Sequence, residues 1–310
     1  MAPDLTVIVV NWNTRELLRD CLRSVVDGNP AGELSIIVVD NGSADGSAEM
    51  VEREFPRVRL LRNQENLGFA KANNQALRLV ETPYACLLNS DTVVAPGTLA
   101  GLVSFMTAHP RTVACAPALR LPSGRLQTGG AGYELNLRTA FNYFFFLSRL
   151  FPERFPGMYL YQDHFVRKGE PLQVDWLAGA CLSVRMTAVR QAGLLDESYH
   201  MYAEDAEWCQ RLGRVGEIRY LPGLEILHLF GASSDKGGAV SVRWLDATFA
   251  YFERQHGRFR LKLFQLVCLG GFLLRMLLYG IGCPLRTGLC AQARAMGVYA
   301  LHSGRRLPGR

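Results

Sequence analysis

The stretch Leu5-Thr6-Val7-Ile8-Val9-Val10, followed by Asn11-Trp12-Asn13, decides the fold class of this chain. Its β-branched residues are typical of a strand that is buried on both faces. Residues 15–26 then carry apolar side chains at helical spacing, with Thr14 at the position of a helix N-cap. A buried strand that leads directly into a helix predicts the first half of a β-α-β unit.

The same alternation continues through the N-terminal third of the chain. Further strands are predicted at 35–39, 58–61 and 84–88, and further helices at 44–55 and 70–80. Strands that alternate with helices predict an α/β fold with a mostly parallel, doubly wound sheet. The chain has no GxGxxG after its first strand and no GxxxxGK[ST] motif, so it lacks the fingerprints of dinucleotide-binding and P-loop proteins.

Polar residues follow each of the four strands: Asn11-Trp12-Asn13, Asp40-Asn41-Gly42-Ser43, Asn66-Leu67-Gly68-Phe69 and Asn89-Ser90-Asp91. Each segment alone is also typical of a turn or a helix cap. In a doubly wound sheet, however, ligands bind at the carboxyl ends of the strands. Because all four segments fall at that edge, they predict a ligand site there.

Composition and charge narrow the class of protein. Hydrophobic residues make up 49% of the 310 residues and charged residues 20%, as in a globular protein. Arg254–Arg310 holds ten Lys/Arg and no Asp/Glu, whereas the rest of the chain holds 24 basic and 28 acidic residues. A basic tail is attracted to nucleic acid or to anionic lipid.

The N-terminus lacks the features of a signal peptide, and the eight cysteines form no CxxC pair. We therefore expect the cysteines to be reduced and the protein to be cytoplasmic.

Taken in order, the motifs resemble those of family 2 glycosyltransferases with the GT-A fold, in particular the bacterial rhamnosyltransferase-like members. Beyond the four strand ends, the matching pieces are Ala70-Lys71-Ala72-Asn73-Asn74, Trp176-Leu177-Ala178-Gly179-Ala180, Tyr202–Arg211, His228 and Gly231-Ala232-Ser233-Ser234. The resemblance covers roughly residues 5–235. It implies a GT-A catalytic domain at 1–235, with a nucleotide-sugar half (1–118) and an acceptor half (119–235), and leaves 236–310 as a helical, basic and apolar tail.

The resemblance implies a nucleotide-sugar site made by Asn11, Asp40, Asn41, Gly68, Lys71, Asn89 and Ser90. The carboxylate of Asp40 can accept hydrogen bonds from a base or a ribose hydroxyl, and an Asx-turn into the next helix is the alternative. The helix that starts at Gly68 would face the diphosphate with its free N–H groups, with Lys71 adding charge. A surface lysine is the alternative for Lys71.

Asn89-Ser90-Asp91 occupies the place of the DxD motif of the family. Oxygen ligands of this kind hold Mg²⁺ or Mn²⁺ against a diphosphate. Asn89 is a weaker ligand than the usual aspartate, so Asp91 is the expected metal ligand. In similar enzymes a histidine at the position of His228 completes the metal shell, and imidazole would favour Mn²⁺. A strand-end turn and a structural histidine are the alternatives.

The resemblance assigns the chemistry to Glu204-Asp205, at the start of a predicted helix. Acidic residues are common at helix N-termini for reasons of dipole alone. Inverting sugar transfer, however, requires a base for the acceptor hydroxyl, and the family uses an Asp of this motif. Asp205 is therefore the expected base and Glu204 its supporting residue. Trp176, Gly179 and Trp208 are the expected acceptor contacts, although core packing explains either tryptophan equally.

The tail is the most apolar part of the chain, over 261–281. Its longest stretch without charge, Leu263–Leu274, has 12 residues, fewer than the about 18–20 needed to span a bilayer. We expect it to lie in the interface of an anionic membrane, helped by Arg286, Arg294, Arg305 and Arg306. Packing on protein is the alternative. The aromatic-rich segment Tyr133–Lys168 matches no motif, and fits a lid, an acceptor groove or a lipid-facing surface.

The resemblance thus predicts an inverting, metal-dependent glycosyltransferase at the inner face of the cell membrane. The preferred donor is dTDP-rhamnose, and the acceptor a glycan or lipid-linked glycan of the cell envelope. A UDP-hexose or UDP-galactofuranose transferase is the first alternative, and a catalytically inactive sugar- or nucleotide-binding subunit the second. The apolar density of the tail and the lack of a nucleic-acid motif argue against nucleic-acid binding.

Overall fold

The computed structural model describes residues 4–28, 34–199, 202–229, 242–283 and 287–305. The chain forms two compact units, one made of Met1–Ala131 and Gln162–Lys236, the other of Gly132–Tyr161 and Gly237–Arg310. We call them the α/β unit and the helical unit. Residues 132–161, which the sequence analysis assigned to the acceptor half, belong to the same compact unit as the C-terminal helices.

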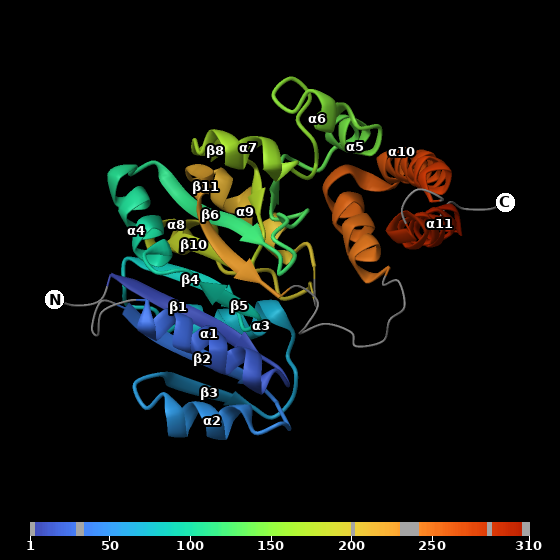
Figure 1. Cartoon of the computed structure of the whole chain (residues 1–310). Helices are drawn as coiled ribbons and strands as arrows, with labels where there is room; N and C mark the ends of the chain where they lie inside the picture. Colours follow the sequence, from blue (N-terminus) through green and yellow to red (C-terminus); the bar gives the residue numbers. More distant parts are fainter. Residues whose placement is uncertain (1–3, 29–33, 200–201, 230–241, 284–286, 306–310) are drawn as a thin grey trace. The chain divides into compact units, whose positions relative to one another are not determined.

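The α/β unit begins with the predicted alternation (Figure 1). Its first elements are β1 (Leu5–Asn11), α1 (Arg15–Asp27), β2 (Leu34–Asn41), α2 (Ser47–Glu54), β3 (Arg59–Asn63), α3 (Phe69–Leu77) and β4 (Tyr84–Asn89). The others are β5 (Thr92–Val94), α4 (Thr98–Ala108), β6 (Thr112–Arg120), β7 (Ala131–Gly132), α7 (Gln162–Lys168), β8 (Leu172–Gln173), β9 (Trp176–Leu177), β10 (Cys181–Arg185), α8 (Met186–Ala192), α9 (Glu204–Gly213) and β11 (Glu217–His228).

The main sheet has the order β3-β2-β1-β4-β10-β6-β11-β5, with β8 also paired to β11. Strands β1 to β4 are parallel, as are β6 and β11, whereas β10, β5 and β8 run antiparallel to their neighbours. The predicted α/β fold with a mostly parallel sheet is therefore confirmed. A separate small sheet pairs β7 with β9.

The apolar face of α1 explains why the first strands and helices pack as they do. Leu18, Cys21, Leu22 and Val25 recur at helical spacing and are all completely buried. They join Val7 and other residues of β1 and β2 in one core. Complete burial of one such side chain stabilises the fold by about 1.5–3 kcal/mol, so this face fixes α1 against the sheet.

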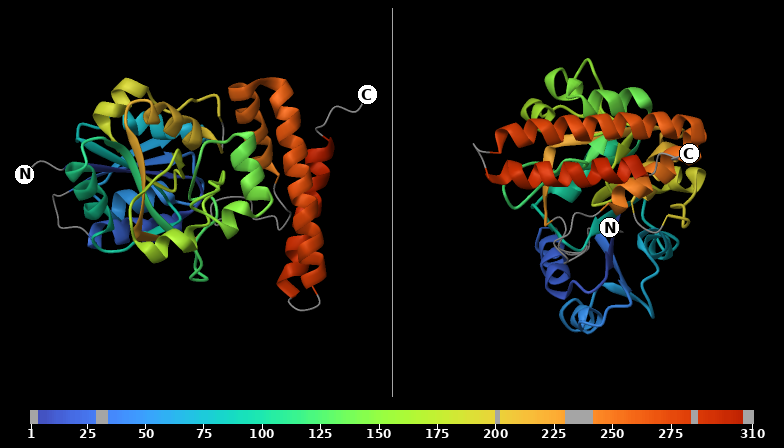
Figure 2. Two further views of the ribbon diagram at one scale, coloured as in Figure 1. Left: turned by 90° about the horizontal axis from the view of Figure 1, so that it is seen from above. Right: turned by 90° about the vertical axis from the view of Figure 1, so that its right-hand side faces the viewer.

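The helical unit contains α5 (Leu137–Phe144), α6 (Leu147–Leu150), α10 (Arg243–Gly282) and α11 (Thr287–Arg305). Gly257 interrupts α10 with φ 79° and ψ 166°, so α10 is two helices joined at a kink. Figure 2 shows the second of these lying beside α11. The core of the unit is aromatic: Phe252 and Phe264 stack across the kink with ring centroids 4.3 Å apart.

Within the described residues α10 is the one helix long and apolar enough to cross a membrane by length and composition. With 40 residues, α10 is longer than the 12-residue charge-free stretch suggested. A third of its most apolar window is buried inside the protein. Length and composition alone do not distinguish a spanning helix from a helix that packs on protein.

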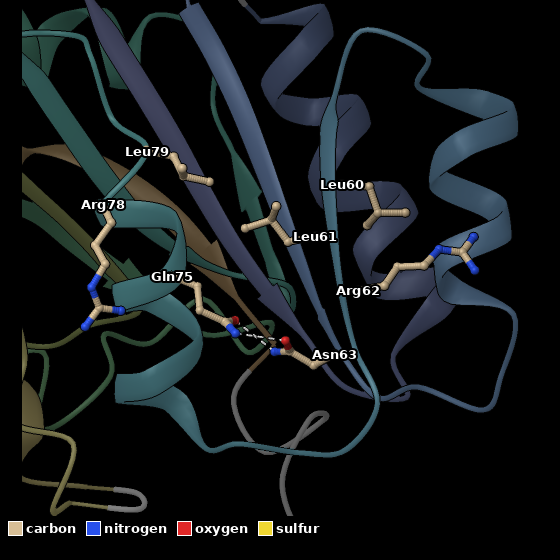
Figure 3. A pocket seen from close by; sticks show the side chains of 7 residues that line it. All are labelled: Leu60, Leu61, Arg62, Asn63, Gln75, Arg78 and Leu79. Atoms are coloured by element: carbon tan, nitrogen blue, oxygen red, sulfur yellow. Dashed lines mark hydrogen bonds between the residues drawn. The ribbon is translucent and has the colours of Figure 1, made fainter.

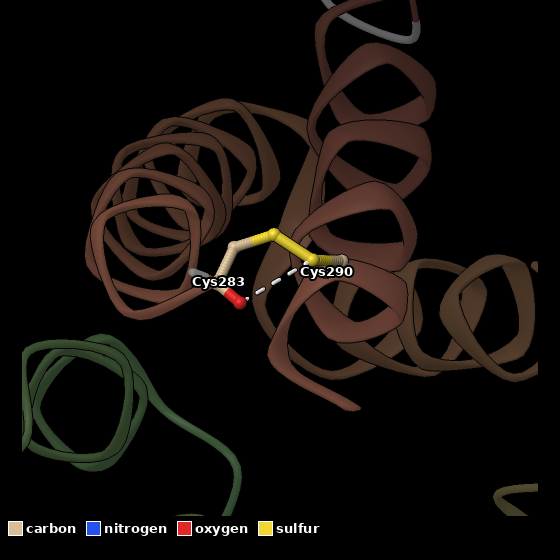
Figure 4. The surroundings of a disulfide bond; sticks show 2 residues. All are labelled: Cys283 and Cys290. Atoms are coloured by element: carbon tan, nitrogen blue, oxygen red, sulfur yellow. Dashed lines mark hydrogen bonds between the residues drawn. A yellow bond between two sulfur atoms is a disulfide. The ribbon is translucent and has the colours of Figure 1, made fainter. Parts of the chain in front are cut away.

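The expectation that all eight cysteines are reduced is wrong for two of them. Cys283 and Cys290 form a disulfide between the end of α10 and α11, with their Cα atoms 4.9 Å apart (Figure 4). The two residues are only seven positions apart, one directly after α10 and the other in the first turn of α11. The other six cysteines are free and buried, as expected.

Candidate active site

The register of the parallel strands aligns three of the predicted polar ends. Asn11 of β1 pairs with Asp40 of β2, and Val10 pairs with Asn89 of β4. Asn11 is completely buried, and its Nδ2 donates to Asp40 Oδ1 at 3.1 Å. Its Oδ1 accepts from Thr14 Oγ1 at 2.6 Å. The ends of β1 and β2 are therefore joined by buried hydrogen bonds.

Two hydroxyl residues that were not among the predicted site residues, Thr14 and Ser43, extend this network. Thr14 Oγ1 lies 2.9 Å from the hydroxyl oxygen of Ser90, which links β1 to the segment after β4. Ser43 Oγ accepts from Asn11 Nδ2 at 3.1 Å, and the Ser43 N–H donates to Asp40 Oδ2 at 3.0 Å. Asp40 therefore does close a turn. Each carboxylate oxygen has two lone pairs, so this turn leaves acceptor capacity for a ligand.

Asn41 organises the segment between β3 and α3. Its Oδ1 accepts from the Leu67 N–H at 3.1 Å, and its Nδ2 donates to Asn66 Oδ1 at 2.8 Å. Gly68 precedes the first turn of α3 with φ 84° and ψ 172°, a conformation open essentially to glycine alone. Lys71 is exposed on that first turn. The N-terminus of α3 is thus held at the same sheet edge.

Asp91 and His228 meet because β5 and β11 pair, with His228 opposite Thr92. Both side chains are buried, and Asp91 Oδ1 lies 3.2 Å from His228 Nε2. On the other side of the ring, His228 Nδ1 lies 2.6 Å from Gln127 Oε1. The amide Nδ2 of Asn89 lies 3.4 Å from Nε2. The two residues predicted as metal ligands are therefore in contact.

The hydrogen bond to Gln127 shows how this pair fits a cation. An amide oxygen only accepts, so the Nδ1 N–H of His228 donates to Gln127. With that proton on Nδ1, the neutral ring would present the Nε2 lone pair to a cation held with Asp91, whereas the doubly protonated ring pairs with Asp91 directly. A second-shell acceptor on the far nitrogen is the usual companion of a metal-binding histidine.

Asp91 and His228 would supply only two ligands of a metal ion. Within the described residues, no group of three or more His, Cys, Asp and Glu side chains comes together as a metal site. Two protein ligands leave the other positions of a Mg²⁺ or Mn²⁺ ion to water and to phosphate oxygens, as is usual where the ion is bound together with a substrate phosphate.

Glu204 and Asp205 open α9 after two residues with positive φ, Tyr202 and Ala203, both at 69°. Non-glycine residues in this region store backbone strain, which persists where the surrounding structure enforces it. Asp205 Oδ2 accepts from the Gly179 N–H at 3.0 Å, and its Oδ1 accepts from the Ala206 N–H at 2.8 Å. The turn therefore fixes the direction of the Asp205 carboxylate.

The two acids differ in what surrounds them. Burial raises the pKa of Asp205, and the hydrogen bonds from Gly179 and Ala206 oppose that rise. Burial also raises the pKa of Glu204, to about 8, and the charge of Asp205 adds to the rise. Within the part of the chain that the structure describes, Glu204 Oε2 is buried without a hydrogen-bond partner. The two N–H donors therefore favour the ionised form at Asp205 relative to Glu204, whose carboxyl is kept protonated by burial.

Gly179 connects Asp205 to the predicted nucleotide-sugar side of the site. A Cβ atom at position 179 would lie 3.0 Å from Cζ of Phe69, the first residue of α3. The backbone of Gly179 therefore packs against α3 while its N–H holds Asp205. The sequence predicted Gly179 as an acceptor contact, and this positioning contact was not anticipated.

The two tryptophans predicted at the acceptor side lie in different environments. Trp176, on β9, is half-buried. Trp208 is completely buried, and its indole Nε1 donates to the Gly193 carbonyl at 2.8 Å. A ring enclosed in this way has no free face on which a sugar can stack, so we leave Trp208 out of the proposed acceptor site. The Gly231-Ala232-Ser233-Ser234 motif, Arg286 and Arg306 lie outside the described residues.

A cavity of about 550 Å³ lies elsewhere in the α/β unit, beside the edge strand β3 (Figure 3). Leu60, Leu61, Arg62, Asn63, Gln75, Arg78 and Leu79 line it. None of them is a predicted site residue. Its arginines are paired with surface acids, Arg62 with Glu49 and Arg78 with Glu197. We therefore do not place the donor there.

The raised pKa of Glu204 predicts a pH-dependent stability. Below its ordinary pKa of 4.5 the carboxyl is protonated in both states, and burial costs no ionisation energy. Above that pH the unfolded chain ionises while the folded protein keeps the proton, so stability falls until the pH passes about 8. Glu204→Gln should therefore raise the midpoint of thermal unfolding by several degrees at about pH 9 and leave it unchanged at about pH 4.5. Equal midpoints of wild type and variant at both pH values would contradict the buried, protonated carboxyl.

The chain matches known proteins in three kinds of comparison. Residues 6–166 match the model of the family described as glycosyl transferase family 2. A relative from Mycobacterium tuberculosis, N-acetylglucosaminyl-diphospho-decaprenol L-rhamnosyltransferase, is 31% identical over 207 residues, which cover 63% of this chain. The match spans 66% of that relative, just under two thirds of its length.

Two solved structures share the fold at low sequence identity. GalNAc-T7 with UDP, GalNAc and Mn²⁺ has a TM-score of 0.60 at 15% identity, over 83% of this chain and 51% of that one. The mannosyltransferase PcManGT from Pyrobaculum calidifontis, with GDP-Man and Mn²⁺, has a TM-score of 0.59 at 16% identity, over 99% and 87%. These structures are GT-A glycosyltransferases, and at such identities they establish the fold alone.

Proposed function

The chain belongs to glycosyl transferase family 2, and we propose that it moves a sugar from a nucleoside diphosphate donor with inversion at the anomeric carbon. Above all, the convergence of Asp91 Oδ1 and His228 Nε2 on one buried point supports this reaction, because a nucleoside diphosphate needs a cation there. Asp205 on its fixed turn supplies the second requirement, a base.

The roles of the residues follow from their chemistry. Asp91 and His228 would hold the Mn²⁺ or Mg²⁺ ion, which when bound supplies positive charge to the diphosphate. Asp205 accepts the proton of the acceptor hydroxyl as that oxygen bonds to the anomeric carbon. The bond from this carbon to the diphosphate breaks, and the nucleoside diphosphate leaves with the electron pair. Asp40 and the start of α3 bind the nucleoside and phosphates.

The preferred donor is dTDP-rhamnose, and the preferred acceptor a lipid-linked glycan of the cell envelope. The Mycobacterium tuberculosis relative is by name a rhamnosyltransferase whose acceptor is linked to decaprenol diphosphate. A UDP-hexose or UDP-galactofuranose transferase remains the alternative, because UDP is the nucleotide in one structure of the same fold. An inactive sugar- or nucleotide-binding subunit would not need both Asp91 and a buried, hydrogen-bonded Asp205.

Calorimetric binding of dTDP, UDP and GDP, each with and without Mn²⁺, tests this function. Tighter binding of one nucleotide in the presence of Mn²⁺ is the expected result, and dTDP would select the rhamnose donor. Preference for UDP would select the alternative donors. An affinity for the nucleotide that is the same with and without Mn²⁺ would contradict the cation site. If none of the three nucleotides bound, the inactive subunit would be favoured.

We also place the protein at the inner face of the membrane, with α10 in contact with anionic lipid. The helical unit has 14 Lys/Arg against four Asp/Glu, a formal charge of +10. The second part of α10 buries Phe264, Cys268 and Phe272 in the core of the unit. Its opposite face carries an exposed apolar stripe: Phe259, Leu263, Leu266, Leu273, Leu277 and Ile281. An apolar stripe on a basic unit is typical of a helix in the interface of an anionic membrane.

Replacing three leucines of the stripe should release the protein from vesicles. We expect Leu266→Ser, Leu273→Ser and Leu277→Ser together to weaken binding to phosphatidylcholine–phosphatidylglycerol vesicles about 100-fold, because three apolar side chains no longer leave water. Flotation of the full chain measures this. Val26→Ser removes an equally exposed apolar side chain from α1 and should have no effect. Unchanged flotation of the triple variant would show that the stripe does not contact lipid.

A further inference from the structure

The helical unit contains a buried arginine whose charge no described carboxylate neutralises. Arg275 of α10 is only 5% exposed. Its guanidinium lies 4.4 Å from the ring centroid of Tyr143, 4.9 Å from that of Phe146 and 5.2 Å from that of Phe144. No salt bridge to Arg275 occurs among the described residues. Aromatic faces stabilise a cation but carry no net charge, so the site remains positive.

The hydrogen bonds of Arg275 use one end of its guanidinium. Nη2 donates to the carbonyl oxygen of Tyr143 at 2.6 Å and to Tyr161 Oη at 3.3 Å. The N–H groups of Nε and Nη1 make no hydrogen bond of normal length among the described residues, although the Tyr143 hydroxyl lies close enough for Arg275 to influence its pKa. Neither nitrogen is completely enclosed by the protein, so both remain accessible to a ligand.

The charge of a second arginine, Arg149, also acts on the Tyr161 hydroxyl. Burial raises the pKa of Tyr161 to about 12, and the charges of Arg275 and Arg149 both oppose that rise. Arginine matches the oxygens of a phosphate in a bidentate manner, so the Arg275 guanidinium and the Tyr161 hydroxyl, under the added charge of Arg149, are suited to a phosphate.

The hydrogen bond from Arg275 to the Tyr143 carbonyl also gives Arg275 a structural role in the fold. Tyr143 lies in the last turn of α5, where a cation stabilises the free carbonyl groups of a helix. This role uses Nη2 alone. It does not require the rest of the guanidinium to remain without a hydrogen bond.

We propose that Arg275 and Arg149, with the Tyr161 hydroxyl, bind the diphosphate of a lipid that carries the acceptor. The neighbours of this cluster in the chain are apolar and exposed: Leu150 is 66% exposed, Phe151 56% and Leu278 45%. Exposed leucine and phenylalanine beside a phosphate site suit a ligand with a hydrocarbon chain. The assignment rests on the proposed function in one respect, the lipid-linked nature of the acceptor.

The position of Arg275 on α10 favours an acceptor carrier over a bulk phospholipid. Arg275 projects from the side of the helix that carries Phe264 and Cys268, opposite the stripe of Phe259, Leu266 and Leu277. A helix with its side chains is about 10–12 Å across, so a phosphate at Arg275 is raised above lipids that contact the stripe. A carrier that presents a sugar must rise in this way, whereas a structural phospholipid remains in the plane of the membrane.

Vesicle binding by the full chain tests the assignment without any sugar transfer. Three vesicles are compared: neutral phosphatidylcholine, phosphatidylcholine with polyprenyl diphosphate, and phosphatidylcholine with phosphatidylglycerol at the same surface charge. We expect the tightest binding to the polyprenyl diphosphate vesicles, and competition by soluble inorganic pyrophosphate. Arg275→Gln and Arg149→Gln should each weaken that binding by about 10- to 100-fold, as the loss of charge-assisted hydrogen bonds implies.

Arg138→Gln is the matched control, because Arg138 is exposed on α5 and its replacement removes the same charge. Arg149 is exposed, so Arg149→Gln keeps the test valid if Arg275→Gln fails to fold. Equal losses in all three variants, or none in Arg149→Gln and Arg275→Gln, would overturn the assignment.

The comparison between vesicles identifies the ligand. Equal affinity for both charged vesicles would show that the ligand is any anionic lipid. Binding of pyrophosphate without a preference for the lipid diphosphate would show that the ligand is free phosphate. Asp205→Asn should bind these vesicles normally, which separates this proposal from the catalytic one.

Discussion

Asp205→Asn should lower kcat by about 100- to 10,000-fold while it leaves the affinity for the nucleoside diphosphate unchanged, because general-base catalysis contributes that range. The amide has the size of the carboxylate but cannot take the acceptor proton. The contacts of Asp205 are hydrogen bonds from the Gly179 and Ala206 N–H groups, not contacts to the strand ends. Steady-state kinetics together with calorimetry of nucleotide binding measure both effects.

The pH profile of the wild type provides an independent check. The base is active when ionised, and burial raises the pKa of Asp205 above its ordinary value of 3.8. The rate should therefore fall as the pH falls through that raised pKa, and this acidic limb should be absent from the residual rate of Asp205→Asn.

Two further variants show whether the loss of rate is specific to the carboxylate of Asp205. Asp20→Asn changes an exposed carboxylate on α1 and should keep full activity. Glu204→Gln should cost much less than Asp205→Asn at neutral pH, because the raised pKa of Glu204 keeps that side chain protonated. If Asp205→Asn retained more than about a tenth of the wild-type kcat, another group would have to take the proton.

Regular periodicity explains why the sheet edge could be predicted from the sequence. Each parallel strand of a doubly wound sheet ends at the same edge, so the four polar segments had to approach one another. Asn11 and Asp40 became neighbours through the register of β1 and β2. Such arguments need only the order of strands and helices.

Contacts between residues that are far apart in the sequence could not be predicted in this way. Gln127 contacts His228 across 101 positions, and no local pattern marks it as a partner of a metal ligand. The aromatic segment near Phe144 packs against Phe272 of α10, so its place in the helical unit depends on contacts far along the chain. Helical spacing alone likewise did not show that Trp208 faces the core.

Asp91→Asn should abolish the Mn²⁺-dependent part of nucleotide binding and lower kcat/KM by about 100- to 1,000-fold. An amide oxygen remains, but the charge that attracts a divalent cation is lost, and a bound cation contributes several kcal/mol to stabilising the leaving diphosphate. The fold should persist, since the contact that joins Asp91 to Leu229 is made by its backbone carbonyl. Calorimetry with and without Mn²⁺, followed by kinetics over a range of Mn²⁺ concentrations, measures both losses.

Gln127→Leu tests the same site through its second shell. Removal of the amide oxygen leaves His228 Nδ1 without the acceptor that fixes the ring, so Mn²⁺ should bind about 10- to 100-fold more weakly while saturating Mn²⁺ restores most of the rate. His228→Gln should not be rescued in this way, because a ligand itself is missing. Asp20→Asn again serves as the control for a lost surface charge. Full Mn²⁺ dependence in both Asp91→Asn and His228→Gln would place the cation elsewhere, and the contact between these two side chains would then be structural.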